Sequence, residues 1–260
     1  MSIPRNIIDV TIIQYNTNGD ILYLNRSGLK DRHLGVCKLF SLAFDGKTSG
    51  ELRICINDQG LYDTINISDF KECAHNCYPC YIFSYDDYDE KCARMQELAT
   101  SPYIHDKMLW IGTISSKVRE DFMRIQHERL LNIDRSTGVF ISHEDHTKYR
   151  YLIDIEGGDL RLGFTGFSER IPYLLHTGRL LFIVDRPLYD WVLSLLEPWV
   201  HYVPVKRDFS DLFEKIEWAD THPVEVGEII KNALRVAPKR VDAVHQVKKL
   251  ISSGLKLSAT

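Results

Sequence analysis

The sequence contains no apolar run long enough to cross a membrane or to form a secretory signal. A spanning helix needs about 20 mostly apolar residues, and a signal sequence has an apolar stretch of about 7–15. The N-terminal region offers only Arg5 and the short mixed run Ile7–Val10. We therefore expect no membrane span and a soluble, cytoplasmic protein. The final residues Leu257–Thr260 also differ from the Lys-Asp-Glu-Leu type of retention signal.

An excess of basic residues is absent as well. The chain has 32 Lys and Arg against 36 Asp and Glu, a formal net charge of -4. Affinity for nucleic acid rests on broad neutralisation of phosphates by basic residues, so nucleic acid is not an expected partner. Internal repeats and low-complexity stretches are also lacking. With 44% hydrophobic and 26% charged residues, the 260-residue chain is typical of a globular protein. We prefer two compact lobes to one large domain.

The six cysteines lack the spacing of a structural zinc site. Cys73, Cys77 and Cys80 are crowded around His75, whereas Cys92 stands alone further on. Structural zinc sites use short paired spacings in both halves. Small buried or free thiols are therefore the leading interpretation, and a zinc site is the alternative.

The first hundred residues contain short β-type runs with irregular connections, which predict an α/β lobe over residues 1–105. These runs are Val10–Ile13, Ile21–Tyr23, Leu52–Ile56 and Tyr81–Tyr85.

From Met108 onward, strands and helices alternate, which is typical of a parallel sheet with helices on its faces. The expected elements are strand Met108–Ile111, helix Lys117–Leu131, strand Val139–Ser142, strand Tyr151–Ile155, helix Glu169–Thr177 with Gly178 as its stop, and strand Leu180–Val184. After a strand that ends at Val205, Asp208 is positioned to cap one helix and Pro223 to open the next. We expect a break at Pro238 and a last helix over residues 240–260. Residues 106–239 thus predict a Rossmann-like lobe.

Two loops between a strand and a helix are candidates for phosphate binding. One is Gly112–Arg119, with Thr113, Ser115 and Ser116, and the other is Gly166–Arg170, with Phe167 and Ser168. Free N–H groups at a helix start and an Arg one turn later can bind a phosphate. A plain N-cap is the alternative for either loop. Their occurrence in successive units favours a nucleotide.

The segment Pro198–Lys206, followed by Asp208–Leu212, is the most informative stretch of the chain. Its prolines and apolar residues predict an extended, buried strand. Aromatic rings and a cation, here Lys206, near the end of a strand can hold a base or a phosphate. The segment resembles glycosyltransferase family 90, which includes protein O-glucosyltransferases and capsule-associated xylosyltransferases. The stretches Trp110–Arg119, His146–Leu152 and Gly166–Arg170 resemble motifs of the same family. The compact chain looks most like members from large algal viruses.

The resemblance implies a GT-B fold, in which two Rossmann-like lobes face a cleft and the last helix packs back on the first lobe. The resemblance implies a UDP-sugar donor, with UDP-xylose preferred and UDP-glucose as the alternative. It also implies a carbohydrate acceptor and no metal cofactor. It assigns the diphosphate to Ser168, Arg119 and Arg170. The donor-binding set is then Gly112, Thr113, Ser115, Ser116, Arg119, Gly166, Phe167, Ser168, Arg170 and Lys206.

Asp58 is the candidate catalytic base. It follows the predicted strand Leu52–Ile56, and ligands of open α/β sheets gather at the carboxyl ends of strands. Inverting sugar transfer needs a carboxylate that takes the proton of the acceptor hydroxyl, and Ile54–Gly60 resembles the family segment that supplies it. Asp63, Asp69 and Asp87 are the other candidates.

One alternative is a metal-dependent transferase. Asp87 and Asp89 have the Asp-x-Asp form that can bind Mg or Mn to a diphosphate, although the surrounding acidic stretch is also typical of a solvated loop.

The other alternative is a protein of a different class, a non-catalytic nucleotide-binding or zinc-stabilised interaction module. His143 and His146 resemble metal ligands, but on one strand they would point to opposite faces. Glu156 and Asp159 are candidates for contact with sugar hydroxyls. Trp199 and Tyr202 are candidates for stacking on a base or sugar, although core packing is the preferred interpretation of both.

Overall fold

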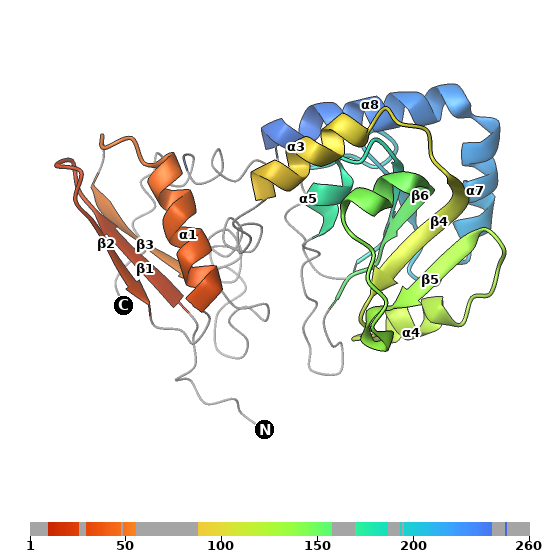
Figure 1. The fold of residues 1–260 in the computed structure, drawn as a ribbon, viewed down its shortest axis with the longest axis horizontal. Helices are drawn as coiled ribbons and strands as arrows, with labels where there is room; N and C mark the ends of the chain where they lie inside the picture. Colours follow the sequence, from red (N-terminus) through yellow and green to blue (C-terminus); the bar gives the residue numbers. More distant parts are fainter. Residues whose placement is uncertain are drawn as a thin grey trace. The chain divides into compact units, whose positions relative to one another are not determined.

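The computed structural model describes residues 10–25, 30–47, 49–55, 88–157, 170–186, 193, 195–240 and 248. The chain divides into two compact units (Figure 1). Unit 1 comprises Met1–Tyr88 with Asp242–Thr260, and unit 2 comprises Asp89–Val241. The helix expected over residues 240–260 lies almost entirely outside the described residues.

Unit 1 contains a three-stranded antiparallel sheet in the order β2-β1-β3. Its elements are β1 (Val10–Tyr15), β2 (Ile21–Asn25), α1 (Lys30–Ala43) and β3 (Gly50–Cys55). The β1–β2 hairpin is closed by Asn16, whose Oδ1 accepts the N–H groups of Asn18 at 2.9 Å and Asp20 at 3.1 Å. Phe40 of α1 packs its ring 5.1 Å from that of Tyr15. Aromatic contacts therefore join the helix to the sheet.

The described part of unit 1 differs from the expected Rossmann-like lobe. Its three strands lie where the β-type runs predicted them, but their pairing is antiparallel, so the Rossmann-like prediction is wrong for these residues. The strand that precedes Asp58 is the edge strand β3 of this sheet. The rule on the carboxyl ends of parallel strands does not apply to β3, and Asp58 itself lies outside the described residues.

Unit 2 is built on a five-stranded sheet in which every pairing is parallel, in the order β5-β4-β6-β7-β8. Its strands are β4 (His105–Gly112), β5 (Leu130–Asp134), β6 (Tyr149–Asp154), β7 (Leu180–Val184) and β8 (Val203–Val205). Its helices are α3 (Tyr88–Leu98), α4 (Lys117–Met123), α5 (Arg170–Leu174), α7 (Leu212–Thr221) and α8 (Pro223–Arg240), with the short 3-10 helices η1 (Arg135–Thr137) and η2 (Glu144–Lys148). The parallel sheet confirms the α/β class.

The strand order defines where a ligand is expected in unit 2. In chain order the five strands lie as second, first, third, fourth and fifth, which is a doubly wound arrangement. The direction of winding reverses between β4 and β6. Ligands of such sheets bind outside the carboxyl ends of the strands at this switch point.

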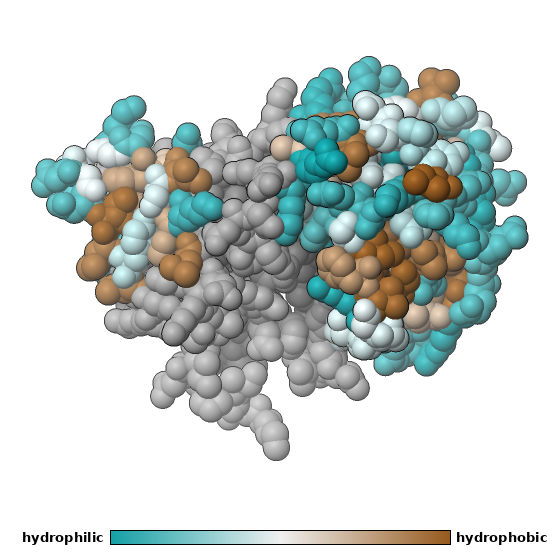
Figure 2. Space-filling view, viewed as in Figure 1, coloured by the Kyte–Doolittle hydropathy of each residue, from teal (hydrophilic) through white to brown (hydrophobic). Residues whose placement is uncertain are grey.

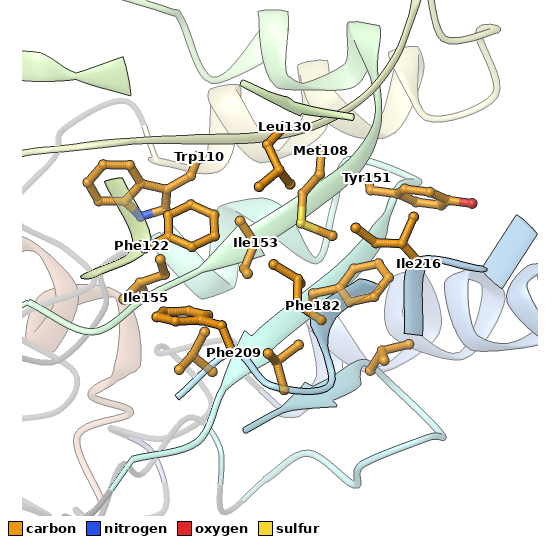
Figure 3. Close-up of a cluster of buried hydrophobic side chains, with 14 of the residues drawn as sticks. Met108, Trp110, Phe122, Leu130, Tyr151, Ile153, Ile155, Phe182, Phe209 and Ile216 are labelled. Carbon is orange, nitrogen blue, oxygen red and sulfur yellow. The ribbon is translucent and has the colours of Figure 1, made fainter. Parts of the chain in front are cut away.

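A large hydrophobic cluster of unit 2 lies on one face of this sheet and contains alternate residues of β4, β6 and β7, among them Met108, Ile153 and Phe182 (Figure 3). Trp110, Ile153 and Phe182 are each at most 2% exposed and pack with Phe122 of α4 and Phe209. The whole of β7 is buried, as expected for a central strand of a parallel sheet covered on both faces. Figure 2 shows a hydrophobic area of surface where Figure 1 places β4 and β5.

The structure corrects several predicted boundaries in unit 2. The helix predicted over Lys117–Leu131 ends at Met123, because Asn132 Nδ2 donates to the carbonyl oxygens of Phe122 and Ile125 and the chain enters β5 at Leu130. The strand predicted at Val139–Ser142 has no regular structure.

Near the C-terminus, two further expectations are wrong. The extended strand predicted from Trp199 to Val205 is a turn followed by the three-residue strand β8. The break predicted at Pro238 is absent, since α8 continues to Arg240. Pro223 does open α8, and α7 starts after Asp211 rather than after Asp208.

Candidate functional site

Four arginines and two carboxylates meet at the carboxyl ends of the parallel strands in unit 2. Arg119 lies on α4, Arg170 starts α5, Arg186 follows β7, and Arg207 follows β8. Asp154 ends β6, and Glu156 follows two residues later. This group, here called the arginine cluster, occupies the switch-point edge.

Arg119 joins the ends of the two strands that flank the switch point. Its Nη1 donates to the carbonyl oxygen of Thr113 at 2.7 Å and to Ser115 Oγ at 3.3 Å. Its Nη2 and Nε donate to the carbonyl oxygen of Ile155 at 2.9 and 3.3 Å. Burial, with a contribution from the nearby Arg170, lowers the pKa of Arg119 to about 9. Arg119 is therefore a cation at neutral pH that is held in an environment poor in water and close to other cations.

Asp154 is buried between two other arginines of the cluster. Its Oδ1 lies 3.4 Å from Arg170 Nη2, and its Oδ2 forms an ion pair with Arg186. Arg170 also donates to the carbonyl oxygen of Ile111, at the end of β4. Because a buried carboxylate must be paired to be stable, Asp154 fixes the positions of both guanidinium groups at the sheet edge.

Glu156 has an unusual environment for a buried carboxylate. It is 1% exposed, and Arg207 Nη2 lies 2.5 Å from its Oε1 as an ion pair. Neither carboxylate oxygen accepts a well-aligned hydrogen bond from a described residue. Arg207 Nη1 donates to the carbonyl oxygen of Asp185 at 3.2 Å. Glu156 therefore keeps capacity to accept hydrogen bonds.

Within the described residues, the cluster carries more positive than negative charge. Two carboxylates face four guanidinium groups, and three of these carboxylate–arginine contacts are ion pairs. An excess of positive charge in a buried site favours the binding of an anion. One guanidinium group can bind two phosphate oxygens through two parallel N–H···O hydrogen bonds. The arrangement is suited to a diphosphate.

The structure brings together five of the predicted donor-binding residues, Gly112, Thr113, Ser115, Ser116 and Arg119, between β4 and α4. At Gly112 a Cβ would lie 2.9 Å from the Trp110 ring, so only glycine fits without a shift of that ring. Ser116 is the N-cap residue of α4, but its hydroxyl makes no capping bond. Its Oγ is buried and has no hydrogen-bond partner among the described residues.

Only the first of the two predicted phosphate-binding loops lies wholly within the described residues. The helices α4 and α5 have only seven and five residues, so the positive charge at this edge comes mainly from arginine side chains. Arg170 lies in the cluster as predicted. Lys206 is exposed after β8, and its N–H donates to Asp211 Oδ1 at 2.9 Å. Gly166, Phe167 and Ser168 lie outside the described residues.

The sequence interpretation missed three members of the cluster, Asp154, Arg186 and Arg207. Each lies at or just beyond the end of a strand of the parallel sheet. The rule that sites form at the carboxyl ends of such strands would have selected them, had it been applied to β6, β7 and β8 and not only to the predicted strand before Asp58.

The two histidines considered as metal ligands lie next to and on the 3-10 helix η2, not on a strand. Their ring centroids are 6.1 Å apart. His146 is buried, its Nδ1 lies 2.7 Å from the carbonyl oxygen of Ser142, and burial lowers its pKa to about 4. The described part of the chain holds no group of three His, Cys, Asp or Glu that could bind a metal. The His143 ring packs 4.6 Å from that of Tyr173.

Some of the remaining candidate residues belong to the described part of the structure and others do not. Cys92 is buried on α3, Asp89 lies in the first turn of α3, and Tyr202 is buried, whereas Trp199 is 44% exposed. The other members of these sets, Cys73, Cys77, Cys80, His75, Asp87, Asp159, Asp63 and Asp69, lie outside the described residues. None of the described helices is long and apolar enough to cross a bilayer.

The fold and the cluster together define an α/β protein with a cationic site at the switch point of a parallel sheet. The family model for glycosyl transferase family 90 matches residues 107–247, which include every described strand of that sheet after the first two residues of β4. The chain belongs to this family, which confirms the resemblance seen in the sequence.

Several known proteins are similar to the chain over part of their length. Protein O-glucosyltransferase 2 of Danio rerio is 31% identical over 140 residues, which are 48% of this chain and 27% of that protein. Protein O-glucosyltransferase 3 of Homo sapiens is 38% identical over 93 residues, 36% of this chain and 17% of that protein. Uncharacterized protein 179R of Invertebrate iridescent virus 6 is 32% identical over 102 residues, 36% of this chain and 8% of that protein. The chain thus spans about a quarter or less of the length of these relatives, and its viral relatives include iridescent viruses.

Among solved structures, Anabaena Alr3699/HepE in complex with UDP-glucose matches 63% of this chain and 44% of its own length. The TM-score is 0.41 and the sequence identity is 14%.

Proposed function

We propose that this chain binds a UDP-sugar at the arginine cluster and transfers the sugar to a hydroxyl of a carbohydrate acceptor. The observation that carries the proposal is the cluster itself, in which Arg119, Arg170, Arg186 and Arg207 outnumber the carboxylates Asp154 and Glu156 at the switch-point edge. Membership of glycosyl transferase family 90 and relatives named protein O-glucosyltransferase support a sugar nucleotide as the ligand.

The cluster can supply the main electrostatic requirement of the reaction. When the bond between the sugar and the diphosphate breaks, negative charge grows on the leaving UDP. Guanidinium groups fixed in a buried site stabilise that charge without reorganising. Arg170 and Arg186 are held on Asp154, which makes them the best oriented pair for the diphosphate. Arg119 mainly orders the loop after β4, since its donors are taken by carbonyl oxygens and Ser115.

Glu156 is suited to recognition of hydroxyl groups on the donor. Its buried oxygens lack well-aligned hydrogen bonds from described residues, and a buried carboxylate is stabilised by each O–H that it accepts. Ribose and sugar hydroxyls are such donors. Loss of Glu156 should therefore weaken the binding of UDP-sugars more than that of inorganic diphosphate.

The proposed mechanism is a single displacement with inversion. The oxygen of the acceptor hydroxyl attacks the anomeric carbon, the bond from that carbon to the diphosphate breaks, and the hydroxyl proton passes to a carboxylate. We keep Asp58 as the proposed base. Because charge on UDP falls to arginines, the proposed reaction needs no metal. Xylose is the proposed sugar, and glucose, named in the relatives, is the alternative.

A transfer assay tests this function. The chain is incubated with UDP-xylose or UDP-glucose and a panel of carbohydrate acceptors, with chelator or with added Mg or Mn, and both UDP release and the sugar product are measured. We expect transfer in chelator, and its loss in Asp58→Asn with UDP binding retained. Transfer only with metal would instead favour Asp87 and Asp89, and UDP binding without any transfer would favour a non-catalytic module.

A further inference from the structure

Trp199 is held in a strained backbone conformation with its ring at the surface. Its φ is 63°, and the residue is 44% exposed. A bulky side chain rarely adopts positive φ, because its Cβ then crowds the backbone. Such strain costs free energy that burial of the side chain could offset. Because 44% of the residue stays exposed, burial offsets only part of this cost, so folding alone does not fully account for a Trp at this position.

The turn that carries Trp199 is fixed by hydrogen bonds on both sides. The Trp199 N–H donates to the carbonyl oxygen of Tyr202 at 2.7 Å, and the His201 N–H donates to that of Glu197 at 3.0 Å. The His201 ring accepts the Glu197 N–H at Nδ1, at 2.9 Å. The exposed indole is thus presented by a rigid turn and needs little ordering when a ligand binds.

The neighbours of Trp199 show which part of its ring is open. Lys215 Nζ lies 5.6 Å from the ring centroid, and the Lys215 side chain is only 16% exposed, so this cation covers the inner face. Trp218 of α7 meets the ring edge-on at 4.9 Å and stacks in turn on His222 at 5.2 Å. Among the described residues, the face of Trp199 opposite Lys215 is therefore the exposed one, and it stands at the end of a row of three rings that runs to the C-cap of α7.

We infer that Trp199, Trp218 and His222 form a binding site for a carbohydrate chain. The apolar face of a sugar ring stacks on an indole, and the surrounding polar groups bind its hydroxyls. Thr221 is exposed and supplies one such group at the end of the row, where its hydroxyl oxygen lies 2.9 Å from His222 Nδ1. A mixture of rings and polar side chains suits a sugar better than a protein partner, whose interface needs a larger contiguous area.

This site is distinct from the arginine cluster. The turn precedes β8, whereas Arg207 follows it, so the two lie at opposite ends of that three-residue strand. The strand spans roughly 10 Å at about 3.3 Å per residue. Binding of sugar here does not depend on the nucleotide. The role of the site rests on the proposed function. In that role, it binds an acceptor chain at a point distant from the hydroxyl that reacts.

Calorimetric titration with maltotetraose, cellotetraose and xylotetraose, without nucleotide, tests the inference. We expect at least one of them to bind saturably, Trp199→Ala to weaken that binding at least tenfold, and Phe140→Ala to leave it unchanged. Phe140 is a matched control because it is 67% exposed and follows β5, at the opposite edge of the sheet. UDP affinity, measured in parallel, should be the same in all three proteins, which separates this site from the arginine cluster.

Trp199→Gly tests whether the ring serves folding instead. Glycine adopts positive φ without strain, so this variant should melt at or above the temperature of the unsubstituted chain and still lose sugar binding. Four results would overturn the inference: no saturable binding of any of the three sugars, unchanged binding in Trp199→Ala, a melting temperature lowered by several degrees in Trp199→Gly, or a Trp199-dependent dimer in sedimentation.

Discussion

Arg119 on α4 donates two hydrogen bonds to the carbonyl oxygen of Ile155, just beyond the end of β6. The same guanidinium donates to the carbonyl oxygen of Thr113 after β4. One side chain thereby satisfies backbone groups on both sides of the switch point. The geometry of the candidate site depends on this contact, because the two strand ends carry the residues that face a ligand.

The first prediction concerns this contact. Arg119→Met should lower the free energy of unfolding by about 2–4 kcal/mol, because it removes the donor from the buried carbonyl oxygen of Ile155 and from the partly buried one of Thr113. Urea unfolding measures the change. Arg124→Met is the matched control, since that side chain is 69% exposed and only forms a surface ion pair with Asp121. The control should change stability by less than about 0.5 kcal/mol. Equal effects in both variants would contradict the role given to Arg119.

The second prediction concerns pH and His146. Burial lowers the pKa of His146 from 6.5 to about 4, so the unfolded chain binds a proton at this residue that the folded chain excludes. The stability that results is complete above pH 6.5 and is lost as pH falls from there towards 4. At pH 5 the loss is on the order of 2 kcal/mol.

Urea unfolding at pH 7 and pH 5 measures this dependence. In His146→Gln the difference between the two pH values should shrink by that amount, whereas in the exposed control His127→Gln it should stay as in the unsubstituted chain. An unchanged difference in His146→Gln would show that His146 is not the group responsible.

The third prediction uses two glycines of unit 2. Gly178 has φ of 65°, and a Cβ there would lie 2.4 Å from the carbonyl oxygen of Ala99. Gly178→Ala should therefore destabilise the protein by more than about 2 kcal/mol, from strain and steric overlap together. At the exposed helical Gly227 nothing lies within 4 Å, and Gly227→Ala should stabilise by about 0.5–1 kcal/mol. Thermal unfolding of the two variants gives opposite shifts, and shifts of the same sign would refute the assignment.

The fourth prediction separates the two edges of the sheet. Asp220 of α7 accepts hydrogen bonds from Arg129 at 2.8 and 3.2 Å and from the Tyr151 hydroxyl at 2.6 Å, and it pairs with Arg150 at 3.0 Å. Asp220→Asn should lower the free energy of unfolding by about 1–3 kcal/mol, because its partners are only partly exposed.

UDP affinity in Asp220→Asn should remain within about twofold, well under the 1.4 kcal/mol of a tenfold change, since this network lies at the amino-terminal edge of the strands. Calorimetric titration checks it. A large loss of UDP binding in the folded variant would place the nucleotide elsewhere than at the arginine cluster.

The sequence predicted the parallel sheet well because its central strands are continuous apolar runs. Leu180–Val184 was predicted with the bounds that the structure has. It predicted β5 poorly, because the polar Asn132 interrupts that strand and its role, to cap α4, depends on a contact that only the fold creates. The long α1 of unit 1 was missed since its apolar residues do not follow a clear helical period.

The sequence identified only part of the candidate site, because contacts that the fold creates determine the roles of its residues. Arg119 and Arg170 were found from their loops, but their roles were assigned as if each faced a phosphate alone. The structure shows instead that Arg119 is bonded to backbone carbonyls and that Arg170 shares Asp154 with Arg186. Arg119 and Arg186 are far apart in the sequence. They lie in one cluster because the order of the parallel strands places the ends of β4, β6 and β7 side by side.

Calorimetric titration with UDP in chelator decides whether the arginine cluster binds the nucleotide. The proteins compared are the unsubstituted chain, Arg170→Met, Arg186→Met and Lys117→Met. Lys117 is the control cation, because it lies on α4 with its side chain 57% exposed and pairs with Asp121. We predict that the unsubstituted chain and Lys117→Met bind UDP equally. Each arginine variant should bind it at least tenfold more weakly, about 1.4 kcal/mol, while remaining folded. Undiminished binding in both arginine variants would contradict the account.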